Sequence, residues 1–315
     1  MNARIATLLL LSLAPSVTGA AEPDMDLDAF ATKIAQFQKI RQEVGLPEHL
    51  LKPEAKRNGK EFTLNKYFEI FKTLRLKPGT RLDWVYSFSD LGGQPLLYIR
   101  DESQKPFQTS AELVEAVREE AKLDQIKTIW EDHSVGTKRL FDEFGDNPFT
   151  LDKEADAALE KLDKELIRRL NQYPRREYWH WWRESVIADG SSQSYLELAA
   201  LFMLADQFAL RWHSMFNDLE ILPNRTAIQD RLGRHFRESE GKKEFIPDEV
   251  SAKALKLDPT PKVRFRDKTV EVSLLTFTKW GGFQRKTLVI SKTSPHVVKS
   301  ETDKTEVEWE CGIMY

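Results

Sequence analysis

The chain has one cysteine and no long apolar segment. These two shortages limit the classes of protein to which it can belong. Cys311 is the only cysteine among 315 residues, so an internal disulfide is impossible. It follows Val307 and Trp309 at alternate positions, and free cysteines are usually buried, so we expect Cys311 to be packed inside the protein. The apolar runs at 5–13 and 198–205 are far shorter than the ~20 residues of a membrane-spanning helix. The sequence therefore predicts no transmembrane anchor.

An excess of positive charge is also missing. The formal net charge is −3, and it becomes −4 if the first twenty residues, whose only charged side chain is Arg4, are removed. This balance argues against general affinity for nucleic acid or for anionic membrane surfaces. Small neutral or cationic partners remain compatible with it. With 31% charged residues of mixed sign and abundant apolar ones, the chain is expected to be globular.

No sequence motif identifies a reaction or a cofactor. The chain contains neither the G-x-S-x-G nor the H-E-x-x-H pattern of hydrolases. Gly92-Gly93 and Gly281-Gly282 lack the lysine and the strand-to-helix context of phosphate-binding loops, so we interpret them as hairpin turns. The sequence therefore predicts no cofactor and no metal site.

The N-terminus resembles a cleavable export signal in its three-part organisation. Met1 to Arg4 carries a positive charge, Ile5 to Leu13 is apolar, and Thr18-Gly19-Ala20 supplies small residues before Ala21. This order is typical of a secretory signal peptide. We expect residues 1–20 to be removed and the mature protein to be extracytoplasmic, in the periplasm or secreted.

The apolar periodicity of the remainder predicts an α+β fold. Three- and four-residue spacing from Phe30 to Val44, and again over 64–71, predicts two early helices. The period then changes, and 84–88 with 96–99 predict a β-hairpin. Because an isolated hairpin is marginally stable, we expect it to join the C-terminal sheet.

A helical body and then a small antiparallel sheet are expected after the hairpin. The helices are expected at 110–122, 124–132, 135–144, 151–172, 176–188, 194–216 and 227–239. Leu196 to Ala205 is apolar all round, which favours a central position, and Ser194 to Glu197 has the spacing of a capping box. The strands are expected at 263–266, 270–274, 288–290 and 307–309, with a bulge after Leu274.

The predicted organisation divides the chain by these patterns. It comprises a signal peptide (1–20), N-terminal helices and the hairpin (21–108), a helical bundle region (109–240), a connector (241–262) and an antiparallel β region (263–315), with 21–315 compatible with one domain.

The segment from Glu177 to Glu184 is the most unusual local sequence. On an α-helix, Glu177, His180 and Glu184 would share one face, and two carboxylates beside an imidazole could act in acid–base chemistry. A dimetal site would need the Glu-x-x-His spacing twice, and it occurs once. Trp179, Trp181 and Trp182 could stack on sugars if exposed, or wedge between helices if buried.

Asp206 and His213 form a second candidate group. They are seven residues apart in the expected helix 194–216 and would therefore lie on one face. A carboxylate next to so apolar a run needs a partner, either His213 or an arginine. Such a pair would be structural, or it would be an Asp-His couple for proton transfer.

These features leave three functional hypotheses. The first is a non-enzymatic exported binding or interaction protein whose partner is polysaccharide or an envelope protein. The second is an extracytoplasmic hydrolase that uses Glu177, His180, Glu184, Asp206 or His213 in a helical cleft. The third is a structural subunit that pairs through a sheet edge.

Overall fold

The computed structural model describes most of the chain between residues 25 and 312. The described residues are 25–44, 48–50, 52, 56–89, 92–121, 132, 134–136, 138–139, 157–158, 161–165, 178–239 and 242–312. The predicted signal peptide and the helices expected at 124–132, 135–144 and 151–172 lie wholly or largely outside them. The described part combines helices with antiparallel sheets, so the fold is α+β.

The N-terminal helices lie where the apolar spacing predicted them. Helix α1 (Leu27–Glu43) begins after Asp26, whose side chain accepts a hydrogen bond from the Ala29 N–H at 2.8 Å. A 3₁₀ turn, η1 (Glu48–Leu50), and helix α2 (Asn65–Ile70) follow. The Phe37 ring of α1 lies 4.3 Å from the Tyr67 ring of α2, so the two helices share one apolar contact.

Helix α6 (Ser192–Leu204) occupies the centre of the molecule, as its all-round apolar sequence predicted. All its residues from Ser194 onward are buried. The helix begins earlier than the predicted capping box, because the Ser191 hydroxyl accepts from the Ser194 N–H. It also ends twelve residues before the expected boundary at 216, since the chain turns away after Leu204.

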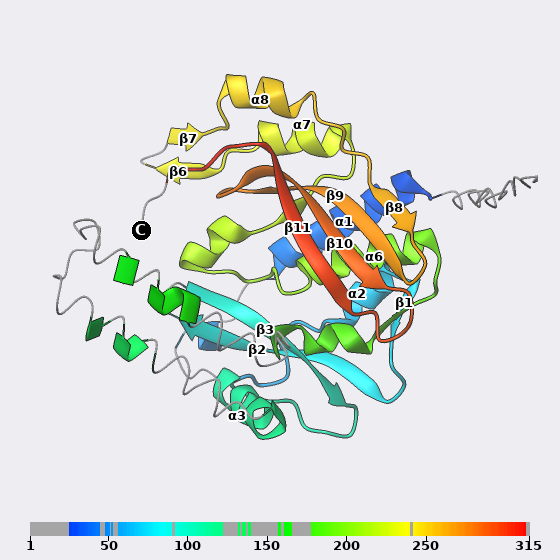
Figure 1. The fold of residues 1–315 in the computed structure, drawn as a ribbon, viewed down its shortest axis with the longest axis vertical. Coiled ribbons are helices and arrows are strands. Elements are labelled where there is room, and N and C mark those ends of the chain that lie inside the picture. Colours follow the sequence, from blue (N-terminus) through cyan, green and yellow to red (C-terminus); the bar gives the residue numbers. More distant parts are fainter. Residues whose placement is uncertain are drawn as a thin grey trace, which may run out of the picture.

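The C-terminal sheet has five strands, four of them in the region where the sequence predicted strands. They are β5 (Glu220–Ile221), β8 (Lys262–Phe265), β9 (Thr269–Thr278), β10 (Gly282–Ser291) and β11 (Val298–Val307), all antiparallel to their neighbours. Figure 1 shows β9 to β11 in front of α1 and α6, with α7 (Arg225–Gly233) and α8 (Asp248–Ala254) along one end. Cys311 is 7% exposed, which confirms its predicted burial.

The bulge predicted after Leu274 is absent from the ladder between β9 and β10, whose register is continuous there. The alternation of apolar and polar residues changes after Leu274 for another reason. Val272 and Leu274 belong to the main core around α6, whereas Leu275 and Phe277 belong to a second core under α7 and α8. Strand β9 is therefore buried on both faces at its end, and alternation stops without any change in backbone register.

The early hairpin forms as predicted but does not join the C-terminal sheet. Strands β2 (Thr80–Ser89) and β3 (Gly92–Asp101) make a separate two-stranded sheet in the described part of the chain. Both faces are covered by other means: Val85 and Tyr98 lie against Leu113 of α3 (Ser110–Ala121), and Trp84 enters the main core. Burial of both faces supplies the stability that we had expected from further strand pairing.

The region expected to be a helical bundle contains both helices and strands where the structure describes it. Residues 178–185 form a 3₁₀ helix, η2 (Tyr178–Ser185), and the next three form β4 (Val186–Ala188), which pairs with β1 (Leu74–Leu76). A second 3₁₀ helix, η3 (Trp212–Asn217), replaces the expected end of the central helix. Strands β6 (Arg237–Ser239) and β7 (Lys242–Glu244) form a short hairpin after α7.

Candidate functional site

The residues around Trp182 do not form the predicted helical face. Residues 178–185 form a 3₁₀ helix, which turns every three residues, so the four-residue spacing from position 180 to position 184 does not return to one face of it. Glu177 and the side chains of Trp179, His180 and Trp181 lie outside the described residues.

Trp182 is 1% exposed and meets the Phe202 ring edge-on at 5.6 Å. It therefore wedges against α6, and the sugar-stacking interpretation is wrong for this tryptophan.

Asp206 and His213 do not share a helical face, because α6 ends at Leu204. The chain then turns, and His213 lies in η3, with its side chain outside the described part. The hydrogen-bond partner of the Asp206 side chain among the described residues is Gln207, at 3.5 Å. The predicted arginine contact is therefore replaced by longer-range attraction to Arg183.

A cavity of about 470 Å³ lies beside the C-terminal end of α1, and we name it the α1 pocket. Helix α1 contributes Arg41 and Gln42 to its lining, and Val44 follows directly after the helix. The segment after α6 contributes Gln207, Ala209 to Arg211, Met215 and Asp218, and Lys279 comes from the turn between β9 and β10. The pocket thus gathers residues from three parts of the chain that are far apart in sequence.

One wall of the α1 pocket has a strained backbone. Ala209 and Trp212 have φ values of +50° and +53°, in a region that residues with a side chain seldom adopt. Such conformations cost free energy and persist only where the surroundings hold them, often at ligand sites. Trp212 is 62% exposed and Met215 is 47% exposed, so this wall also presents apolar surface to solvent.

The β2–β3 hairpin holds the strained wall in place. The Tyr86 hydroxyl donates to the Ala209 carbonyl at 2.6 Å, and Gly93 and Arg211 exchange backbone hydrogen bonds. A Cβ on Gly92 would lie 2.3 Å from the Arg211 carbonyl oxygen, and one on Gly93 would lie 2.6 Å from the Tyr86 hydroxyl. The two glycines therefore permit the close approach of the hairpin to the pocket wall.

Positive charge exceeds negative charge around the α1 pocket. Its lining contains three cationic side chains, Arg41, Arg211 and Lys279, and a single carboxylate, Asp218. The Arg41 side chain is 1% exposed, and its Nη2 donates to Asp218 at 3.1 Å and to the Leu219 carbonyl at 3.2 Å. Its Nε and Nη1 have no hydrogen-bond partner within the described residues. Buried donors are rarely left unpaired, so this guanidinium is incompletely satisfied.

Two carboxyl groups at this site have raised pKa values. Burial raises the pKa of Asp218 despite the opposing charge of Arg41, and nearby Glu220 adds to the rise. Burial likewise raises the pKa of Asp206, against the charge of Arg183. Both acids are therefore easier to protonate than an exposed aspartate.

We expect Asp206→Asn to stabilise the protein at pH 7 by about 1 kcal/mol, because it removes a poorly compensated buried charge. A raised folded-state pKa means that stability is lost as pH rises above the ordinary value of 3.8. The gain should therefore vanish in urea melts at pH 3. The exposed Asp101→Asn is the control and should change neither melt. Loss of stability in Asp206→Asn at pH 7 would contradict this account.

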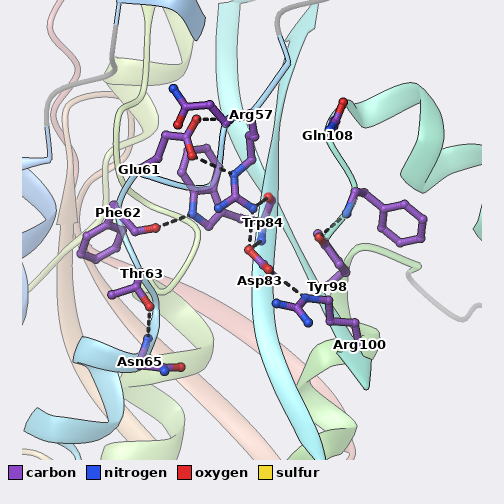
Figure 2. Close-up of polar contacts among 12 residues, drawn as sticks. Arg57, Glu61, Phe62, Thr63, Asn65, Asp83, Trp84, Tyr98, Arg100 and Gln108 are labelled. Atoms are coloured by element: carbon purple, nitrogen blue, oxygen red, sulfur yellow. Dashed lines mark hydrogen bonds and ion pairs between the residues drawn. The ribbon is translucent and has the colours of Figure 1, made fainter. Parts of the chain in front are cut away.

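A second group of buried charges lies on the hairpin, away from the pocket, and Figure 2 shows it. Asp83 accepts hydrogen bonds from Arg57 and, at 2.9 Å, from Arg100. The Arg57 guanidinium also lies 4.4 Å from the centre of the Trp84 ring, and Glu61 approaches its Nε at 3.8 Å. These opposite charges lie close together, although Arg57 Nε and Glu61 Oε2 make no hydrogen bond among the described residues, and we interpret the group as a clamp that fixes residues 56–63 on β2.

The pocket residues were not among the predicted site residues, although one signal was present. Arg41 is four residues after Phe37 and seven after Ile34, which places a charge on the buried face of α1. A charged residue in register with core positions requires a buried partner or a ligand. Arg211, Asp218 and Lys279 carry no comparable signal, because only tertiary structure brings them to α1.

Within the described residues, no helix is both long and apolar enough to cross a membrane, and no cluster of three or more His, Cys, Asp or Glu side chains is placed to hold a metal ion. In the comparisons with known proteins, no family model, no curated protein and no solved structure matches the chain.

Proposed function

We propose that this chain is an exported, non-enzymatic binding protein whose ligand carries an acidic group and lies in the α1 pocket. The observation that carries the proposal is the buried Arg41, whose guanidinium retains unpaired donors beside a cavity with two further cationic side chains. An acidic ligand would supply the negative charge and the hydrogen-bond acceptors that the lining lacks.

The apolar part of the lining indicates a second property of the ligand. Val44, Leu210 and Met215 adjoin the cationic side chains, so the acidic group is expected to carry a small apolar substituent. Envelope material, whether polysaccharide or protein, is the source most compatible with the predicted export. The buried Trp182 gives no support to a neutral sugar platform, which shifts the proposal toward acidic ligands.

N-acetyl-leucine is a suitable probe, because it combines one carboxylate with one apolar side chain. We expect it to bind at least about tenfold more tightly than its uncharged amide, since a charge-assisted hydrogen bond contributes about 1.5–3 kcal/mol. Trp212 adjoins Arg211 and is largely exposed, so its fluorescence can report binding, and calorimetry can confirm it.

Arg211→Gln should reduce that affinity about tenfold, whereas Arg75→Gln, at an exposed arginine outside the pocket, should leave it unchanged. Equal binding of the acid and the amide would overturn the proposal.

The hydrolase hypothesis retains one specific observation in its favour. Burial raises the pKa of Asp206, next to Gln207 of the pocket lining, and a general acid needs such a shift. A hydrolase would release nitrophenol from a panel of nitrophenyl esters and glycosides, and Asp206→Asn would abolish the release. Failure of the whole panel would remove this alternative.

Export can be examined independently of binding. We expect protein recovered outside the cytoplasm to have an intact mass that corresponds to a start near Ala21 or Glu22. Retention of residues 1–20 would contradict the predicted signal peptide.

A further inference from the structure

A second and larger hollow continues the α1 pocket along the same helix. It has a volume of about 900 Å³ and lies between α1 and α7, with β5 at its base. Gln42 lines both hollows. Asp28, Ala35 and Gln42 recur at seven-residue spacing, so one face of α1 forms a continuous wall. We name this second hollow the α1–α7 groove.

The charges along α1 are arranged with opposite signs at the two ends. Asp28, in the first turn of α1, lines the far end of the groove, and Asp230 of α7 lines the groove as well; within the described residues neither carboxylate makes an ion pair or a side-chain hydrogen bond. Glu220 also lines the groove, but Arg234 binds it directly and Arg231 approaches it at 3.7 Å. The cationic end is the α1 pocket itself. Thirteen residues of helix separate Asp28 from Arg41, which corresponds to about 20 Å.

The middle of the wall is rich in amide side chains, and the one cation that α1 contributes there, Lys39, lies 3.7 Å from Glu43. Gln42 and Gln229 face the hollow, and Gln38 donates to the Ile221 carbonyl at 3.2 Å while its side-chain oxygen remains an acceptor. A carboxamide offers both donors and acceptors, as a peptide backbone requires.

From this arrangement we infer that the α1 pocket and the α1–α7 groove together bind an extended peptide, with its free C-terminal carboxylate in the pocket and its N-terminal amine near Asp28. The inference rests on the proposed acid-binding function of the pocket. A strand rises about 3.3 Å per residue, so about 20 Å accommodates about six residues. An acidic polysaccharide fits less well, because it would place negative charge beside the two aspartates.

A hexapeptide of five alanines and a C-terminal leucine tests the inference against N-acetyl-leucine. We expect the hexapeptide to bind at least about tenfold more tightly, because it also engages the groove. Acetylation of its N-terminus should weaken binding about threefold to tenfold, and Asp28→Asn should remove that difference. Amidation of the peptide's C-terminus should weaken its binding both to the unaltered protein and to the aspartate variant.

A pair of tryptophan variants separates the groove from the pocket. Ala35 is exposed and lines the groove, whereas Gln36 is exposed on the same helix and lines neither hollow. Ala35→Trp should reduce hexapeptide affinity to that of N-acetyl-leucine without altering N-acetyl-leucine binding. Gln36→Trp should alter neither.

If N-acetyl-leucine binds but the hexapeptide binds no more tightly, the groove inference fails and the proposed pocket function stands. If neither binds, both fail. A hexamer of galacturonic acid that binds more tightly than the peptide, and loses affinity in Ala35→Trp, would assign the groove to a polysaccharide and overturn the peptide inference.

Discussion

Replacement of Asp83 by alanine should lower the free energy of unfolding by about 3–5 kcal/mol, because the buried Arg100 loses its carboxylate and the buried Arg57 keeps only Glu61, at 3.8 Å. The side chains of Arg57 and Arg100 are only 8% and 9% exposed, and Asp83 is the carboxylate that both of them contact. Asp83 also accepts a hydrogen bond from the Trp84 N–H. Urea unfolding followed by tryptophan fluorescence measures the loss.

Asp101→Ala is the matched control, since Asp101 ends the neighbouring strand with an exposed side chain. Its effect should stay within about 0.5 kcal/mol. An equal loss in the two variants would show that the clamp contributes no specific stability.

The same clamp predicts a dependence on acid. Burial alone would raise the pKa of Asp83, but hydrogen bonds and charge from Arg57, together with Arg100, outweigh burial and lower it. The pKa of Glu61 is also lowered, because hydrogen bonds from the Asn58 N–H and His49 outweigh burial. A lowered folded-state pKa gives stability above the unfolded value, and that stability is lost as pH falls through the folded value. Asp83→Asn should therefore flatten the acid limb of the stability profile.

The sequence correctly predicted the helices whose burial follows from the spacing of their own apolar residues. The apolar stripe of α1 and the uniformly apolar α6 both gave the correct element and the correct degree of burial. The end of α6 was not predictable in the same way, because Asp206 to Ser214 continues a weakly helical composition. Tertiary hydrogen bonds from Tyr86 and Gly93 hold that segment in a strained conformation that no local preference favours.

The candidate site was harder to predict for the same physical reason. Its cations come from a helix, a strained loop and a strand turn, and no fixed spacing relates Arg41, Arg211 and Lys279. The residues that local sequence made conspicuous were Trp179, Trp181 and Trp182, and Trp182, the one of these three whose burial is described, lies in the core. Large aromatic residues stabilise cores in proportion to their area, so an unusual concentration of them indicates packing at least as often as binding.

Glu197 shows how a local pattern can give a side chain the wrong role. Its spacing from Ser194 predicted a capping box, yet its carboxylate is fully buried and lies 2.5 Å from the Lys33 ammonium. The Thr73 hydroxyl donates to the same carboxylate at 2.5 Å, and the Gln193 amide donates at 2.9 Å. This single charge therefore ties α1 and the segment before β1 to the central helix.

Removal of the two partners should have unequal effects. Lys33→Met should destabilise the protein by about 3–5 kcal/mol, because the buried carboxylate is left without its cation. Glu197→Met should cost only about 1–2 kcal/mol, since Thr73 and Gln193 lose an acceptor. In that variant the Lys33 side chain, already 25% exposed, can extend its ammonium into water.

The double variant tests this asymmetry in urea melts at pH 7. Lys33→Met together with Glu197→Met should be more stable than Lys33→Met alone, because no buried charge remains. Equal losses in the two single variants at pH 7 would mean that Glu197 reaches solvent, and burial would then not be the reason for its contribution to stability.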